Sequence, residues 1–106
     1  MIAVPREPSR FSARTSPMLY MVIERFKAGN PTAVGQRFKA KGRLMPEGSG
    51  VAYVASWMAA DGSCCYQLMD SPGLIELAPW IAAWSDLVEF EVIPVQSSAD
   101  FWAARG

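Results

Sequence analysis

Residues 51–69, VAYVASWMAADGSCCYQLM, decide the fold that this chain predicts. Two runs rich in β-branched and aromatic residues, 51–59 and 64–69, flank Asp61-Gly62, a dipeptide that strongly favours a tight turn between antiparallel strands. The chain has the same order on both sides of this hairpin: going outward, a helix-like run comes first and a strand-like run follows. The sequence therefore predicts the order strand, helix, strand, strand, helix, strand.

The helix before the hairpin has clear start signals. Asn30 is a good N-cap and Pro31 a good first helical residue, so we expect a helix that runs to about Met45. Its apolar side chains recur at helical spacing, which predicts one buried face. Arg37 and Arg43 fall off that face, and we expect them to point outward into solvent.

The helix after the hairpin begins with a similar pair, Ser71-Pro72. Pro79 lies inside this run and lacks a backbone N–H, so we expect either a kink or two short pieces, the stronger at about 79–85. Ser85 and Asp86 are expected to lie in the turn into the last strand, where the side chain of Asp86 or Ser85 bonds local backbone. The alternative is that this turn is a polar loop at the mouth of a pocket.

The outermost strand-like runs, 18–26 and 87–95, complete the pattern. The first, MLYMVIERF, is apolar on both parities, which suits a central strand covered on both faces. Pro94 cannot donate a ladder hydrogen bond, so the last run is expected at a sheet edge. The order predicts an α+β domain of the ferredoxin-like type: βαββαβ, with a four-stranded antiparallel sheet and helices on one face.

Composition narrows the classes of function. The chain has 106 residues, which predicts one domain, and its 51% hydrophobic and 19% charged residues favour a homodimer that buries a further face. Basic and acidic residues are equal at 10 each, which argues against nucleic-acid binding. No apolar run is long enough to span a bilayer and no signal-peptide pattern is present, so we expect a cytoplasmic protein without membrane contact.

The residue types also limit the chemistry. Histidine is absent, which removes the commonest metal ligand and the commonest general base near neutral pH. We therefore expect no metal site and no cofactor, and we assign no catalytic residue. Cys64 and Cys65 are adjacent and cannot staple the fold, so we expect reduced thiols, at least one of them buried, rather than a redox pair.

Three regions are expected along the chain. Residues 1–17 hold three prolines and three arginines without periodicity, which predicts a disordered arm or an over-long start. The alternative is that this arm is a basic segment that binds a partner. Residues 18–97 are expected to form the ferredoxin-like domain, and residues 98–106 a tail or short helix.

Four blocks of the sequence resemble a family of small, uncharacterised bacterial proteins. They are MLYMVIERF at 18–26, YVASW at 53–57, CYQLM at 65–69 and WIAAWSDLVEFEVIPV at 80–95. The family is a domain of unknown function, and the resemblance covers roughly residues 18–98. It implies a ferredoxin-like or dimeric α+β-barrel domain, and it supplies no activity and no catalytic residues.

The candidate site is the sheet face turned away from the helices. If Leu19, Met21 and Ile23 face the helices, side-chain alternation places Tyr20 and Glu24 on the other face. With matched register, neighbouring strands bring further polar and aromatic residues to that side, a mixture typical of a small-molecule pocket. The predicted ligand-binding residues are Tyr20, Glu24, Tyr53, Trp57, Gln67, Glu89 and Glu91.

Without histidine, carboxylates are the candidate proton-transfer groups. Glu24, Glu89 and Glu91 would raise one another's pKa if they met in a partly apolar site. The competing interpretation is that Glu89 and Glu91 face solvent on an edge strand, where charge prevents aggregation, and that Glu24 pairs with Arg25 or a nearby lysine.

Three functions are compatible with these patterns. The leading one is a small-molecule-binding or interaction module of the dimeric α+β-barrel type, with a small apolar or aromatic ligand. The alternative is a cofactor-independent monooxygenase-like or isomerase-like enzyme in which Tyr20 and Glu24 orient or deprotonate the substrate. The third is a structural partner of another protein, with Trp80, Trp84 and Trp102 as exposed anchors.

Overall fold

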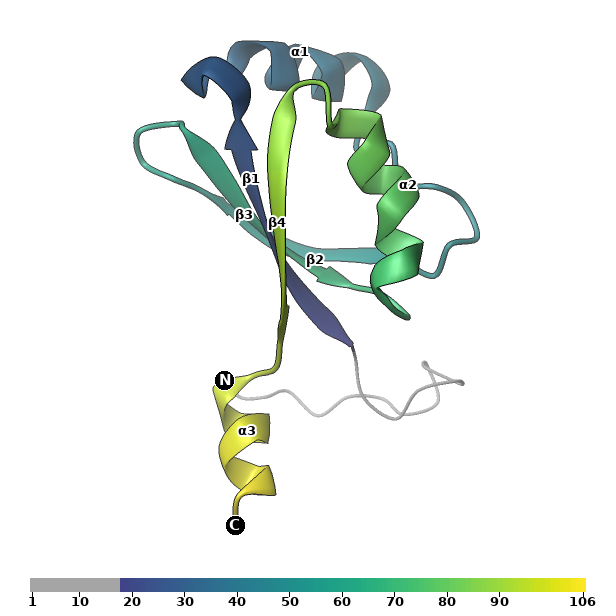
Figure 1. Ribbon diagram of the computed structural model, residues 1–106, viewed down its shortest axis with the longest axis vertical. Coiled ribbons are helices and arrows are strands. Elements are labelled where there is room, and N and C mark those ends of the chain that lie inside the picture. Colours follow the sequence, from purple (N-terminus) through teal and green to yellow (C-terminus); the bar gives the residue numbers. More distant parts are fainter. Residues whose placement is uncertain (1–17) are drawn as a thin grey trace.

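The computed structural model describes residues 18–106, which form a four-stranded antiparallel sheet with three helices (Figure 1). The strands are β1 (Leu19–Phe26), β2 (Ala52–Met58), β3 (Cys64–Asp70) and β4 (Val88–Val95). The helices are α1 (Thr32–Lys41), α2 (Leu74–Trp84) and α3 (Ser98–Ala104), with a 3-10 turn, η2 (Lys27–Gly29), after β1. The predicted fold class is confirmed, and the βαββαβ order with sheet order β2-β3-β1-β4 is consistent with a ferredoxin-like arrangement.

The arm predicted at residues 1–17 lies outside the described residues. Within residues 18–106, no helix is long and apolar enough to cross a membrane.

The sheet places β1 in the centre and β4 at an edge, as predicted. In the ladders, Glu24 lies opposite Cys65 on β3 and opposite Phe90 on β4. These three side chains therefore share one face of the sheet. On β2 the register shifts between Tyr53 and Ala55, so one extra residue enters the ladder there.

The core lies between the sheet and the two helices α1 and α2, on the face of β1 opposite to the one predicted. Tyr20, Val22 and Phe26 are buried toward the helices. The outer face instead carries the three residues predicted to point inward: Leu19, Met21 and Ile23. The prediction was wrong because Glu24 shares the inner face, and a glutamate normally marks the parity that faces water. A cavity on the helix side, described below, accommodates its carboxyl group.

Helix α2 supplies the largest buried side chains. Leu77, Trp80 and Trp84 are buried, and Trp80 is only 1% exposed. Of the two alternatives predicted at Pro79, two separate pieces are wrong, since one helix continues across it. Proline deprives the carbonyl of Ile75 of its helical hydrogen bond, but Ile75 is 82% exposed, so water can satisfy that carbonyl.

Helix α1 begins as predicted and ends early. The side-chain oxygen of Asn30 accepts a hydrogen bond from the Thr32 amide at 2.9 Å, which caps the first turn. The helix stops before Gly42, whose φ of 74° lies in the left-handed region that favours glycine. The predicted extension to Met45 is therefore wrong, and Arg43 lies outside the helix.

Helix α3 stands clear of the sheet in Figure 1, and none of its residues is buried. Ser97 caps it, since the Ser97 hydroxyl accepts a hydrogen bond from the Asp100 amide at 2.9 Å. Of the tryptophans predicted to be exposed anchors, Trp102 is 66% exposed. Trp80 and Trp84 are buried in the core, so the prediction is wrong for both.

Candidate functional site

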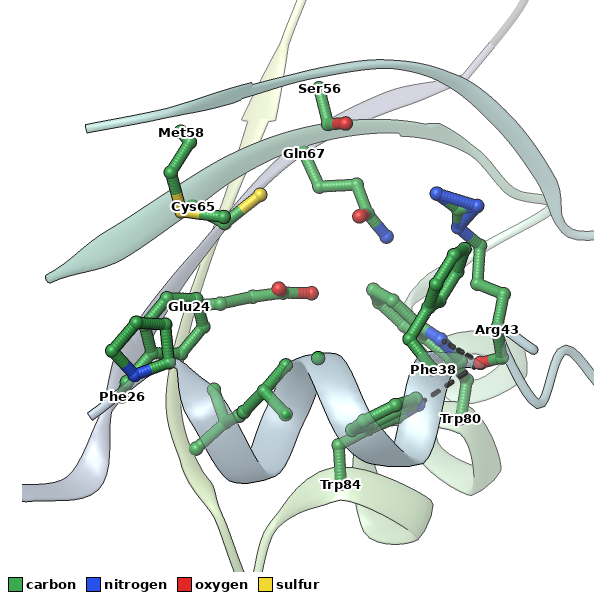
Figure 2. Close-up of a pocket in the computed structure, with 14 residues that line it drawn as sticks. Glu24, Phe26, Phe38, Arg43, Ser56, Met58, Cys65, Gln67, Trp80 and Trp84 are labelled. Carbon is green, nitrogen blue, oxygen red and sulfur yellow. Dashed lines mark hydrogen bonds between the residues drawn. The ribbon is translucent and has the colours of Figure 1, made fainter. Parts of the chain in front are cut away.

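A cavity of about 360 Å³ lies between the inner face of the sheet and helices α1 and α2 (Figure 2). Its walls are mostly apolar: α1 supplies Val34 and Phe38, α2 supplies Trp80 and Trp84, and β1 supplies Phe26. This volume lies at the lower end of the range of small-molecule pockets, about 300–1,000 Å³. The cavity is therefore large enough for one small organic molecule.

Gly35, in the middle of α1, helps to keep this space open. It lines the cavity, and a Cβ atom added to it would meet no atom within 4 Å. A glycine inside a helix costs about 1 kcal/mol relative to alanine. The sequence analysis did not single out Gly35, although a glycine in a helix interior is a recognisable signal.

Glu24 reaches into the cavity from β1, and its carboxyl group points toward the centre of the space (Figure 2). Burial raises the pKa of Glu24 from 4.5 to about 7, and the positive charge of Arg43 partly opposes that rise. Among the described residues no hydrogen-bond or ion-pair partner holds this carboxyl, so the predicted pairing with Arg25 is wrong; Arg25 pairs with Glu91 at 2.9 Å instead. Glu24 is therefore protonated and neutral over much of the range below pH 7.

Arg43 closes one end of the cavity. Its backbone carbonyl accepts hydrogen bonds from the indole N–H groups of Trp80 at 3.1 Å and Trp84 at 3.0 Å (Figure 2). Its guanidinium lies 3.8 Å from the ring centre of Tyr53 and 5.2 Å from that of Phe38. The outward position predicted for Arg43 is wrong because the helix ends at Gly42, one residue before it.

Two residues of β3 complete the polar part of the lining. Gln67 is buried and donates a weak hydrogen bond to the sulfur of Met69 at 3.4 Å. Burial is the main cause that raises the pKa of the Cys65 thiol to about 11, and the negative charge of the nearby Glu24 adds to this rise. A thiol with so high a pKa is a poor nucleophile. Cys64 and Cys65 are both free and buried, as expected for reduced thiols.

A clasp between Arg37 and Asp86 holds α1 over the cavity. The two terminal nitrogens of Arg37 donate to the two oxygens of Asp86 at 2.8 and 2.6 Å, and one also donates to the Ala83 carbonyl at 3.1 Å. This bidentate pairing lowers the pKa of Asp86 from 3.8 to about 2. Asp86 lies in the turn before β4 as predicted, and the expected bond to local backbone is made by Ser85, whose hydroxyl donates to the Ile81 carbonyl at 2.7 Å. Arg37 does not point freely into solvent, so that prediction is wrong.

A family model described as "Domain of unknown function (DUF3303)" matches residues 18–105. The chain belongs to the DUF3303 family. No curated protein and no solved structure matches it. The family predicted from sequence blocks, a domain of unknown function, is thus confirmed, while the description names neither a ferredoxin-like fold nor a dimeric α+β barrel.

The predicted binding residues of this DUF3303 domain divide between the two faces of the sheet. Glu24 and Gln67 line the cavity together. Tyr20 is buried on the same inner face outside the cavity lining, and Tyr53 stacks against Arg43. The remaining three lie on the outer face: Trp57, Glu89 and Glu91.

The register between β1 and β4 explains why Glu89 and Glu91 do not join Glu24. Phe90 lies opposite Glu24, so its two neighbours project to the other side of the sheet. Both glutamates are exposed on the edge strand. Their positions favour the competing interpretation of solvent-facing charges on an edge.

The lining of the cavity in this DUF3303 domain combines apolar walls with a few polar and titratable groups. Within the described residues, no group of three or more Cys, Asp or Glu side chains is placed to hold a metal ion. The lining offers aromatic walls, a carboxyl group whose pKa lies near 7, an amide and a guanidinium. Such a mixture suits the orientation of one small molecule by a few polar groups.

Proposed function

We propose that this DUF3303 domain binds one small, largely apolar molecule in the cavity between its sheet and α1. The observation that carries the proposal is the aromatic-walled space of about 360 Å³ into which Glu24 and Gln67 point (Figure 2). Apolar walls favour binding by removing ligand surface from water, and the two polar side chains fix its orientation.

Two features that cost stability support a binding role over simple packing. Gly35 leaves empty the space that a larger residue would fill, at the expense of helix stability. Glu24 is partly buried in this apolar lining, and the desolvation that raises its pKa to about 7 makes its charged form costly to hold there. Costs of this kind concentrate at functional sites.

Native mass spectrometry of freshly purified protein, repeated after denaturation, tests the proposal together with a cavity-filling variant. We expect an extra mass on the wild type that denaturation releases and that Gly35→Leu lacks. Gln36→Leu, at an exposed neighbouring position that does not line the cavity, is the matched control and is expected to keep the mass. An extra mass retained equally by Gly35→Leu would place the molecule elsewhere and refute the proposal.

A second candidate function, acid–base catalysis, is favoured by one observation. Burial raises the pKa of Glu24 to about 7, the range in which a carboxyl exchanges protons most effectively at neutral pH. Gln67, rather than Tyr20, shares the cavity with it. Exchange of solvent deuterium into small enolisable ketones tests this candidate: it should increase as the pH rises through about 7 and vanish in Glu24→Gln. Equal exchange by this variant would refute it.

We further propose that a second copy of the chain covers the outer face of the sheet. Three large side chains form a row across that face: Trp57 pairs with Tyr66, and Tyr66 pairs with Ile23. Trp57 is 56% exposed and Tyr66 39%. Within residues 18–106, the seven-residue helix α3 has no buried residue and stands clear of the sheet (Figure 1), and so short a helix is unstable in water without tertiary packing.

A symmetric dimer would cover both surfaces at once, because each copy would offer its apolar sheet face and its helix α3 to the other. Sedimentation equilibrium tests this arrangement. We expect a dimer for the wild type and a monomer for Tyr66→Glu, while Ile75→Glu, an exposed position on α2, stays dimeric. A monomeric wild type would refute the dimer.

A further inference from the structure

Arg43 presents a guanidinium whose donors have no acceptor among residues 18–106. The side chain takes part in no hydrogen bond and no ion pair there, and its buried Nε–H has no partner. The flat faces of Tyr53 and Phe38 hold the group by stacking instead. Arginine stays protonated at all ordinary pH values, so this corner of the cavity carries a permanent positive charge.

The other titratable groups that line the cavity do not cancel that charge. Glu24 lies in the same cavity but forms no ion pair with Arg43, and its pKa of about 7 leaves it mostly neutral in mildly acidic solution. Cys65 is also neutral, because burial raises the pKa of its thiol to about 11. Below pH 7 the described lining is therefore an apolar space with one unpaired cation, which favours an anion as ligand.

The shape of the lining indicates which kind of anion fits. Aromatic rings from three elements surround the space: Phe26 on β1, Phe38 on α1, and Trp80 and Trp84 on α2. Rings of this kind pack well against another flat ring. A volume of about 360 Å³ admits a body of one or two rings. A carboxylate matches the fork of a guanidinium by accepting two parallel hydrogen bonds.

We propose that the cavity binds a small aromatic carboxylic acid, with its carboxylate paired to Arg43 and its ring between the aromatic walls. This inference rests on the proposed function, because it names the class of ligand that the same cavity takes. Gln67 and the neutral carboxyl of Glu24 then face any polar substituent on the ring.

A matched pair of probes tests the charge requirement: 2-naphthoate and its neutral amide, 2-naphthamide. Their dissociation constants are measured by ligand-observed NMR at about pH 6. We expect the wild type to bind the acid roughly 10- to 100-fold more tightly than the amide, the range of a charged hydrogen-bonded pair. Arg43→Gln should weaken the acid to the level of the amide and leave the amide unchanged. Arg25→Gln, an exposed arginine on the outer face, should change neither.

Arg43→Lys keeps the charge and loses the fork, so it should bind the acid with intermediate affinity. The comparison of the two probes on the wild type needs no variant and stands even if a variant fails to fold. Equal binding of acid and amide by the wild type would overturn this inference while leaving a ligand cavity in place. If the wild type binds neither probe, this inference is overturned. The proposed function is refuted separately, and only if Gly35→Leu also retains the co-purified mass. Acid binding that is lost in Arg25→Gln instead would locate it on the outer face and overturn the inference.

Discussion

Replacing Glu24 with glutamine tests the electrostatic account of the cavity. Burial raises the pKa of Glu24 from 4.5 to about 7 in the folded protein, whereas the unfolded chain returns the carboxyl to water. Between these two values the folded state holds a proton that the unfolded state has released. The free energy of unfolding therefore falls as the pH rises from about 4.5 to about 7.

The size of the effect follows from the gap between the two pKa values. One pKa unit corresponds to about 1.4 kcal/mol, so the folded protein loses about 3 kcal/mol of stability by pH 8. Glutamine has nearly the same shape as protonated glutamate and does not titrate. The advantage of Glu24→Gln over the wild type should therefore grow by about 3 kcal/mol between pH 4 and pH 8.

Urea unfolding, followed by tryptophan fluorescence at several pH values, measures this difference. Trp80 and Trp84 are buried in the folded state, so their emission reports unfolding. Glu47→Gln is the matched control, since Glu47 is an exposed glutamate in the loop between α1 and β2 and does not line the cavity. Parallel pH profiles for the wild type and Glu24→Gln would show that this carboxyl is solvated, and would refute the reasoning.

Three further results are expected. Arg37 lowers the pKa of Asp86 from 3.8 to about 2, so the stabilising effect of this pair is present above about pH 4 and is lost as the pH falls through about 2. In Asp86→Asn the free energy of unfolding in urea should therefore fall less steeply between pH 4 and pH 2, and an unchanged fall would contradict the pairing of Arg37 with Asp86. Burial raises the pKa of Cys65 from 9.0 to about 11, so its thiolate fraction at pH 8 is about 100-fold below that of an exposed thiol. Alkylation of Cys65, followed by mass spectrometry, should be slower by about that factor. Labelling at the rate of an exposed thiol would be inconsistent with its burial. Gly35→Ala should raise the free energy of unfolding by about 1 kcal/mol, because its Cβ meets open space in a helix; a destabilised variant would argue against the cavity.

The order of elements could be predicted from the sequence because each signal is local. Asp61-Gly62 marks a turn, Asn30 marks a helix start, and Pro94 marks an edge. These signals depend on backbone geometry within a few residues. The four strands and the βαββαβ order followed from them.

The face of β1 could not be predicted, because its run is apolar on both parities and carries one glutamate. If the space between sheet and helices were packed without gaps, Glu24 would have a lower free energy on the outer face, in contact with water. Only the cavity beneath α1 reverses that preference, and its lining includes Trp80 and Trp84 of α2, which lie far from Glu24 in the sequence.

Arg43 was missed for a related reason. Its place in the cavity depends on where α1 ends, and the apolar pattern continues past Gly42 as though the helix did. Helix ends are among the least certain features of sequence-based prediction, and here one residue separates a solvent-facing arginine from a cavity wall. The two indole N–H groups that bind its carbonyl come from α2, about forty residues along the chain, so no local pattern announces them.

The four tryptophans provide the most direct test of the central claim that the cavity is a ligand site. Two of them, Trp80 and Trp84, line the cavity, while Trp57 lies on the outer face and Trp102 on α3. An indole ¹H–¹⁵N NMR titration with 2-naphthoate and 2-naphthamide resolves all four N–H groups in one spectrum. We predict saturable shifts of the Trp80 and Trp84 signals, with one molecule bound per chain, and little change in the other two. If both probes leave Trp80 and Trp84 unmoved, or shift Trp57 and Trp102 instead, the cavity is not the binding site.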